Sequence, residues 1–198
     1  MSRLAVLAIA LTLAGLSAAS AETPSATSAA PAATPAQAPA AIQSGAPAPS
    51  RAADLKNAAG GTIGRVELWA MPAGLLIRVS ARGLTPGWHG MHLHETGDCS
   101  AAAFASAGAH IHSTRGGAHG LLNPNGPEAG DIPNIFIGAD GQGSAQVFTG
   151  RVTMTPDGDA PGLLDADGSA LVIHAAADDQ FTAPAGGSGA RVACAVIR

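Results

Sequence analysis

The chain has 198 residues, with ten Lys and Arg against fourteen Asp and Glu and a formal net charge of −4. Lys56 is its only lysine, so it lacks the basic face that binding to nucleic acid or acidic lipid requires. Without the first 21 residues, nine basic and fourteen acidic side chains remain, a net charge of −5. If this protein handles an anion, the attraction must therefore be local.

The first 21 residues have the pattern of an export signal. Arg3 supplies a positive start, an apolar run follows, and Ala19-Ser20-Ala21 is a small-residue cleavage site. The apolar run is shorter than the about 20 residues of a membrane span, and no stop-transfer pattern follows it. We therefore expect export into a bacterial periplasm, where disulfides persist, and no membrane span in the mature chain.

Residues 22–50 are almost entirely Ala, Pro, Ser and Thr, a composition that predicts a disordered tether. Residues 51–198 are enough for one domain with a proper core. In this part, short alternating runs are broken by Gly and Pro, and no helical periodicity is sustained. The runs 64–70 and 74–80 form a hairpin around the turn 71–74. Further strands are expected at 89–95, 142–154, 169–175 and 191–197.

This pattern predicts an all-β fold, a Greek-key barrel or sandwich of about eight antiparallel strands. Two connections, Thr96–Ile137 and Ala176–Gly189, are too long for tight turns. Long loops in compact domains are usually functional or disordered. The first of them contains His, Asp and Cys, which favours function.

All seven histidines fall within residues 89–174. His92 and His94 are two apart on an expected strand, so both can face one metal while Leu93 points into the core. The alternative is a pair of solvent-facing histidines. His174 ends an apolar strand, where a hydrogen-bonded core histidine is the simpler interpretation, but other imidazoles nearby favour a metal. Imidazole suits copper and zinc, and a roughly planar set of four nitrogens favours Cu(II).

Cys99 and Cys194 are the only cysteines. An even count in an exported protein predicts one disulfide, which would contribute about 2–5 kcal/mol, and a metal-ligand role is the alternative. Glu128, Asp131 and Asp178 would ordinarily be solvated surface acids. Arg191 would ordinarily be an exposed strand end.

Several ordered motifs resemble one family, the Cu/Zn superoxide dismutases, and in particular their bacterial periplasmic branch. They are GWHGMHLHETGDCS, FASAGAH, HGLLNPNGP, AGDIPN, LVIHAAADD and GARVACAVI, and together they span Ala52–Arg198. The resemblance implies catalysis of superoxide dismutation to O2 and H2O2 at a histidine-bound copper, as antioxidant defence in the periplasm. Superoxide would be the substrate, and the chain would be a monomer or a homodimer.

The resemblance also implies a role for each matching residue. The copper ligands would be His92, His94, His110 and His174. The zinc ligands would be His110, which bridges the two metals, with His119 and Asp131. Asp178 would be the carboxylate that holds one ligand of each metal. Cys99 and Cys194 would form the disulfide, Arg191 would attract superoxide beside the copper, and His110 would carry a proton during turnover.

Two positions depart from the family pattern. Glu128 stands where the family usually has a histidine ligand for zinc, and His112-Ser113 stands where it commonly has Asn-Pro. There is also one extra residue between His110 and His119. Three alternatives remain open: Glu128 completes a tetrahedral zinc set, His112 replaces it, or the chain binds no zinc.

Two rival functions also remain open. A non-catalytic periplasmic copper-binding and buffering protein could use the same histidines on a dismutase-like fold. An adhesion-like β-sandwich with incidental histidines is the third interpretation. Arg191 distinguishes a dismutase from the copper-buffering protein, since a buffer needs no anion-attracting residue beside an open copper face.

Overall fold

The computed structural model describes residues 47–113 and 115–198. The expected export signal and residues 22–46 of the expected tether lie outside the described residues. Residues 47–50 lead directly into the first strand, and the Pro47 carbonyl accepts a hydrogen bond from Trp69 Nε1 at 2.8 Å. Within the described ranges, no helix is long and apolar enough to cross a membrane.

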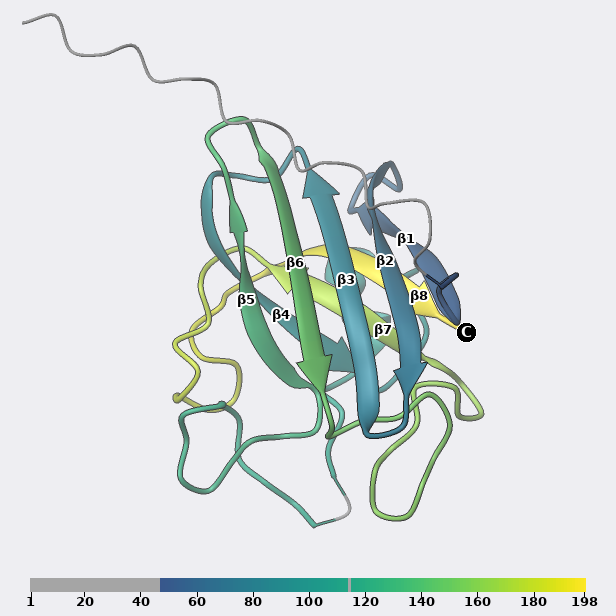
Figure 1. The fold of residues 1–198 in the computed structure, drawn as a ribbon. Helices are drawn as coiled ribbons and strands as arrows, with labels where there is room; N and C mark the ends of the chain where they lie inside the picture. The colour runs from purple at the N-terminus through teal and green to yellow at the C-terminus, as the bar shows by residue number, and fades with distance from the viewer. Residues whose placement is uncertain (1–46, 114) are drawn as a thin grey trace, which may run out of the picture. The chain divides into compact units, whose positions relative to one another are not determined.

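Eight strands close into an antiparallel barrel in the order β1-β2-β3-β6-β5-β4-β7-β8 (Figure 1). The strands are β1 Arg51–Asn57, β2 Thr62–Met71, β3 Gly74–Arg82, β4 Gly87–His94, β5 Asp131–Ile137, β6 Gln142–Thr149, β7 Ser169–His174 and β8 Arg191–Ile197. A short 3-10 helix, η1 Ala102–Ala107, lies in the connection between β4 and β5. The all-β prediction is confirmed, as is the hairpin β2–β3.

Three details of the predicted strands are wrong. β5 lies inside the segment expected to be a loop up to Ile137, because Pro133 and Asn134 obscure the alternation of its buried isoleucines. β6 ends at Thr149 rather than at residue 154, and Thr153 instead makes an isolated bridge with Gly162. β1 was not predicted, since only Leu55 of its seven residues is fully buried and the alternation is weak.

Strand β4 has a different role on each of its faces. Met91 and Leu93 are fully buried in the main barrel core, as alternation requires. The intervening His92 and His94 project from the opposite face. The connection that follows β4 covers that face, and Phe104 of η1 packs there in a second, smaller apolar cluster. The histidines therefore lie between the sheet and the long loop.

The predicted disulfide fixes this covering loop to the barrel. Cys99 in the loop and Cys194 on β8 are bonded, with a Cα–Cα distance of 6.0 Å, and no free cysteine remains. Cys194 packs with Ala170 and Val172 of β7 beneath η1. The loop is thus tied to β8, which pairs with the histidine-bearing strand β7.

Candidate metal centre

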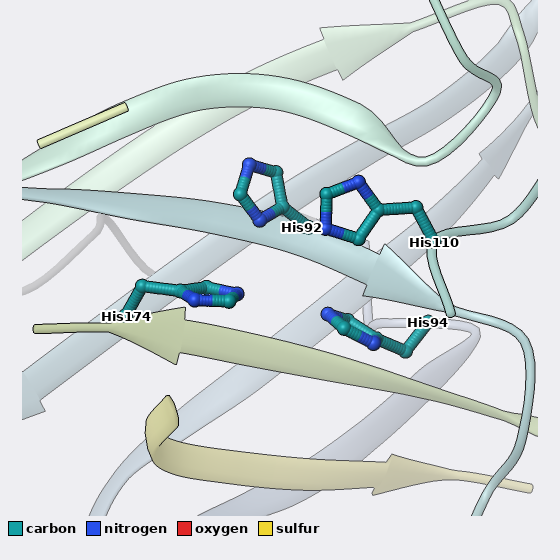
Figure 2. Close-up of side chains that lie close together, drawn as sticks. All are labelled: His92, His94, His110 and His174. Carbon is teal, nitrogen blue, oxygen red and sulfur yellow. The ribbon is translucent and has the colours of Figure 1, made fainter. Parts of the chain in front are cut away.

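Four buried histidines, His92, His94, His110 and His174, form what we call the four-histidine cluster. Each offers one ring nitrogen, and these nitrogens lie within 4.8 Å of one another. Figure 2 shows the four rings turned toward a common space. His92 and His94 come from β4 and His174 from the end of β7, while His110 lies in the loop and is fixed by a backbone bridge to His94. The structure thus brings together all four residues of the predicted copper set.

Hydrogen bonds fix which nitrogen of each strand-borne ring is free. The donors and acceptors are His92 Nε2 to Asp178 Oδ2 at 2.8 Å, His94 Nδ1 to the Gly108 carbonyl at 3.0 Å, and His174 Nδ1 to the Gly189 carbonyl at 3.0 Å. The other nitrogens, His92 Nδ1, His94 Nε2 and His174 Nε2, are buried without a hydrogen-bond partner. Unpaired buried polar atoms are costly, so three lone pairs that face one space fit a metal ion.

Burial keeps these imidazoles neutral. It lowers the pKa of His94 to about 2 and that of His174 to about 4. Burial also lowers the pKa of His92, although its hydrogen bond to Asp178 opposes this shift. Neutral imidazole is the form that binds a metal, so the three strand-borne rings are already in their ligating state near neutral pH.

A second group of donors, the carboxylate cluster, consists of His110, His119, Glu128 and Asp131. Four distances join its candidate ligand atoms: His110 Nδ1 to Glu128 Oε2 2.9 Å, His110 Nδ1 to Asp131 Oδ1 3.6 Å, His119 Nδ1 to Glu128 Oε2 3.8 Å, and His119 Nδ1 to Asp131 Oδ1 2.8 Å. A tetrahedral zinc with bonds near 2.0–2.1 Å separates its ligand atoms by about 3.3 Å. These four of the six pairwise distances bracket that value, as expected for donors that can surround one zinc ion.

His92 also lies within 4.8 Å of the donors of His110, His119 and Asp131. However, its Nε2 already donates to Asp178, and its Nδ1 is one of the free atoms of the four-histidine cluster. Glu128 Oε2, in contrast, is not a member of the four-histidine cluster. It lies against two donors of the carboxylate cluster, His110 Nδ1 and His119 Nδ1. We therefore take Glu128 as the fourth member of the carboxylate cluster.

Backbone groups orient Asp131 so that a single oxygen faces the carboxylate cluster. Its Oδ2 accepts the N–H groups of Gly120 at 2.7 Å and Glu128 at 2.9 Å. Its Oδ1 has no hydrogen-bond partner, although His119 Nδ1 is only 2.8 Å away, and that nitrogen is also unpartnered. Two lone pairs that face each other at this distance repel unless a cation lies between them. Burial opposes the shift, but contacts with His110, Gly120 and His119 lower the pKa of Asp131.

Asp178 connects the two clusters. Its Oδ2 accepts from His92 Nε2, and its Oδ1 accepts from His119 Nε2 at 3.1 Å. Burial opposes ionisation, but the hydrogen bonds from His92, the Gln180 N–H and His119 lower the pKa of this carboxyl. Gly186 adopts φ +57°, and a Cβ there would overlap Asp178 Oδ1, so the loop requires glycine at this position.

Asn134 is a positioning residue that the sequence reasoning missed. Its amide holds the backbone of Asp178 at two points: Nδ2 donates to the Asp178 carbonyl at 2.8 Å, and Oδ1 accepts the Asp178 N–H at 3.0 Å. Asn134 lies on β5 three residues after Asp131. Its place in the motif AGDIPN was the only available signal, because the contact spans 44 residues.

Arg191, at the start of β8, is half-buried beside the four-histidine cluster. Nη1 donates to the Phe104 carbonyl at 2.7 Å and Nη2 to the Gly108 carbonyl at 2.6 Å. The Gly108 carbonyl also accepts from His94 Nδ1, so one backbone group joins the cation to the cluster. The charge of Arg191 contributes to the lowered pKa values of His94 and His174. A positive group therefore lies close to these nitrogens.

The two remaining histidines have different surroundings. His89 is buried, with Nδ1 2.6 Å from the His174 carbonyl and Nε2 2.8 Å from the Thr85 carbonyl, so both nitrogens have backbone partners. His112 has a side chain 54% exposed, and its Nδ1 lies 3.5 Å from Glu128 Oε1. It is thus outside the carboxylate cluster but next to it.

The chain is similar to known proteins over most of its folded part. Residues 59–197 match the family model described as copper/zinc superoxide dismutase (SODC). A copper-zinc superoxide dismutase of Caulobacter vibrioides is 48% identical over 149 residues, which cover 75% of this chain and 86% of that protein. Copper-zinc superoxide dismutase 2 of Aquifex aeolicus is 44% identical over 147 residues, which cover 74% of this chain and 85% of that protein.

Solved structures give the same result. A SOD-like protein from Bacillus subtilis superposes with a TM-score of 0.71 at 37% identity, over 76% of this chain and all of that chain. The Cu/Zn superoxide dismutase from Brucella abortus gives a TM-score of 0.60 at 28% identity, over 75% and 99% of the two chains. Sequence and fold therefore agree on the family.

Proposed function

This chain belongs to the copper/zinc superoxide dismutase family, and from that premise we propose a role for each residue of the two clusters. The activity is the dismutation of superoxide to O2 and H2O2. We assign copper to the four-histidine cluster and zinc to the carboxylate cluster, with His110 shared between them. The observation that carries the copper assignment is the set of three buried, unpartnered nitrogens on His92, His94 and His174.

Bound copper supplies a one-electron couple that can accept an electron from one superoxide and return it to another. The chain must hold that ion with fixed geometry, and rings anchored to Asp178, Gly108 and Gly189 do so. His110 has Nδ1 against Glu128 and its other nitrogen, Nε2, on the side of the four-histidine cluster (Figure 2). In our proposal, Nε2 of His110 would hold a proton only while it is not bound to copper, and it would deliver one of the two protons of the peroxide product, with water supplying the other.

Arg191 supplies the local attraction that the overall negative charge lacks. Burial lowers its pKa from the usual value, but the guanidinium stays charged at neutral pH. Replacing Arg191 by Ala should lower superoxide turnover by about tenfold or more, the lower end of the range for electrostatic steering, with copper affinity nearly unchanged. A non-catalytic copper buffer would show no such separation between turnover and affinity.

In the carboxylate cluster, zinc would be held by His110, His119, Glu128 and Asp131. Support comes from the four distances between 2.8 and 3.8 Å and from the two unpartnered atoms, His119 Nδ1 and Asp131 Oδ1. Zinc held at Nδ1 would fix the His110 ring, and Nε2 would then face the four-histidine cluster. Glu128 thereby takes the place of the histidine usual in the family.

For location, we propose export to the periplasm by the first 21 residues, with residues 22–50 as a tether. The Cys99–Cys194 disulfide supports an oxidising compartment. The N-terminal sequence of the protein recovered from cells tests this proposal. A chain that starts at or near Glu22 is expected, and a chain that retains Arg3 would contradict it.

The proposed chemistry is tested by superoxide consumption after the full chain has been loaded with copper and zinc. Pulse radiolysis or a cytochrome c competition assay should show turnover well above that of the same amount of free copper. Consumption no faster than the free-copper control would contradict the assignment of copper to the four-histidine cluster.

A further inference from the structure

His112 is an exposed imidazole placed against an otherwise sealed group of donors. The side chains of the carboxylate cluster are 10% exposed at Glu128, 7% at His110 and 0% at His119 and Asp131. His112 is 54% exposed and approaches only Glu128, with Nδ1 3.5 Å from Oε1. An ion that arrives from solvent on this side therefore meets His112 and Glu128 before any other donor of the cluster.

The backbone explains why two histidines reach the same carboxylate. Between them, Ile111 is buried, its N–H donates to the Leu93 carbonyl at 2.9 Å, and its carbonyl accepts the Gly130 N–H at 2.8 Å. This pairing keeps the segment extended, so the side chains two residues apart project to one side. Glu128 lies on that side. Its Oε2 contacts the buried His110 at 2.9 Å, and its Oε1 faces the exposed His112.

We propose that His112 Nδ1 and Glu128 Oε1 form a loading site for zinc at the surface, an inference that rests on the zinc site proposed above. The ion binds there first, with water molecules as its remaining ligands. Transfer inward would break the bonds to His112 Nδ1, to Glu128 Oε1 and to the waters. Glu128 Oε2, His110 Nδ1, His119 Nδ1 and Asp131 Oδ1 would form bonds to the ion in their place. The step exchanges metal–ligand bonds only; no electron is transferred, and no covalent bond of the protein forms or breaks.

The proposal accounts for both departures from the family pattern together. A carboxylate has two oxygens and can contact an outer and an inner ion position, whereas a histidine ligand presents one nitrogen to a metal. The second oxygen of Glu128 faces an outer donor, His112 Nδ1. The unpartnered atoms inside, His119 Nδ1 and Asp131 Oδ1, are the destination of the ion.

The test follows zinc uptake in time. Full-length protein freed of zinc by a chelator is mixed with zinc chloride, and the loss of free zinc is recorded by stopped flow with a fluorescent zinc indicator. His112→Asn introduces a residue common in the family and should slow uptake about tenfold, the factor that corresponds to about 1.4 kcal/mol lost from the loading site. Equilibrium zinc affinity should not change.

Two further variants sharpen this test. Ser113→Ala changes the neighbouring side chain without touching a donor of the carboxylate cluster, and it should take up zinc at the wild-type rate. Glu128→His removes the second oxygen, so it should be slow by itself, and His112→Asn should then have no further effect. Such non-additivity is the signature of two residues that act in one step.

Three results would overturn the proposal. His112→Asn protein with wild-type uptake would exclude a role in loading. A fall of about 10–100-fold in its equilibrium zinc affinity would make His112 a ligand or an orienting partner instead. Wild-type protein that binds no zinc at equilibrium would overturn the zinc site itself, a failure that the affinity measurement separates from a failure of the loading site alone.

Discussion

The two clusters share His110 but are built on different kinds of backbone. In the four-histidine cluster, His92, His94 and His174 lie on β4 and β7, which pair in register from Met91 to His94. In the carboxylate cluster, His119 and Glu128 lie in loops, and only Asp131 belongs to a strand, as the first residue of β5. Strand pairing thus fixes the first cluster, whereas side-chain and turn hydrogen bonds must fix the second.

Because of this difference, the two clusters should not tolerate substitution of their supporting residues equally well. The strand-borne rings each need one further hydrogen bond to set the tautomer, and two of these go to backbone carbonyls. In the carboxylate cluster, the Asp178 carboxylate holds His119, and the N–H groups of Gly120 and Glu128 in the loop hold Asp131. We therefore expect the carboxylate cluster to be the more easily disrupted of the two.

The largest effect should come from removal of a strand-borne ligand. His94→Ala deletes one of the three free nitrogens and leaves the Gly108 carbonyl without its ring donor. Superoxide turnover should fall by more than the about 10–100-fold that loss of an outer partner typically costs. Zinc content should be retained, because His94 is not one of the four donors of the carboxylate cluster, although it lies beside the shared His110. Loss of both metals would show that the clusters are not separable.

Removal of the disulfide should affect stability next. Changing Cys99 and Cys194 together to Ser should lower the free energy of unfolding by about 2–5 kcal/mol, measured by denaturant titration. The loop tied by this bond carries the carbonyls of Phe104 and Gly108 that hold Arg191. Turnover should therefore fall more than copper content. Unchanged stability would mean that the packing of η1 on β7 and β8 is sufficient alone.

A substitution at Asp178 should weaken both clusters, but not equally. Asp178→Asn removes the charge that accepts from His92 Nε2 and His119 Nε2. Zinc affinity should fall by about 10–100-fold, as for other outer partners of metal ligands. Copper affinity should fall less, since the β4–β7 ladder still fixes His92 and His94. Equilibrium competition with a chelator for each metal measures both, and an equal loss would contradict the role given to strand pairing.

Acid should release zinc before copper. Burial lowers the pKa of His119, but the hydrogen bond to Asp178 and the nearby Asp131 and Glu128 carboxylates outweigh it and raise the net pKa. Burial lowers the pKa of His94 to about 2 and that of His174 to about 4. As pH falls, protons therefore compete for His119, the proposed zinc ligand, at a higher pH than for His94 and His174, the proposed copper ligands. Metal content after dialysis at a series of pH values should show this order, and copper loss first would contradict it.

Much of the four-histidine cluster could be predicted from the sequence, because alternation on a strand puts His92 and His94 on one face whatever the rest of the fold does. The motif resemblance supplied His110 and His174. The supports of the cluster could not be predicted in this way. The Gly108 carbonyl belongs to the backbone, so no side chain in the sequence marks it as a hydrogen-bond acceptor for His94. The hydrogen bonds between Asn134 and Asp178 depend on how β5 packs against a loop 44 residues away.

The carboxylate cluster was harder to predict for a physical reason. Residue type alone left three alternatives open for zinc, since a glutamate in a loop is usually solvated. In the structure, Glu128 is buried and its Oε2 lies 2.9 Å from His110 Nδ1, while His112 stays outside. These positions depend on tertiary packing of the loop, which no local pattern encodes.

The metal content of the chain after reconstitution with copper and zinc tests the two-cluster account most directly. Elemental analysis of the wild type should give one copper and one zinc per chain, one ion for each cluster. Glu128→Ala should keep the copper and lose most of the zinc. A wild-type chain that holds copper alone, or a Glu128→Ala chain with full zinc, would contradict the assignment of Glu128 as the fourth zinc ligand.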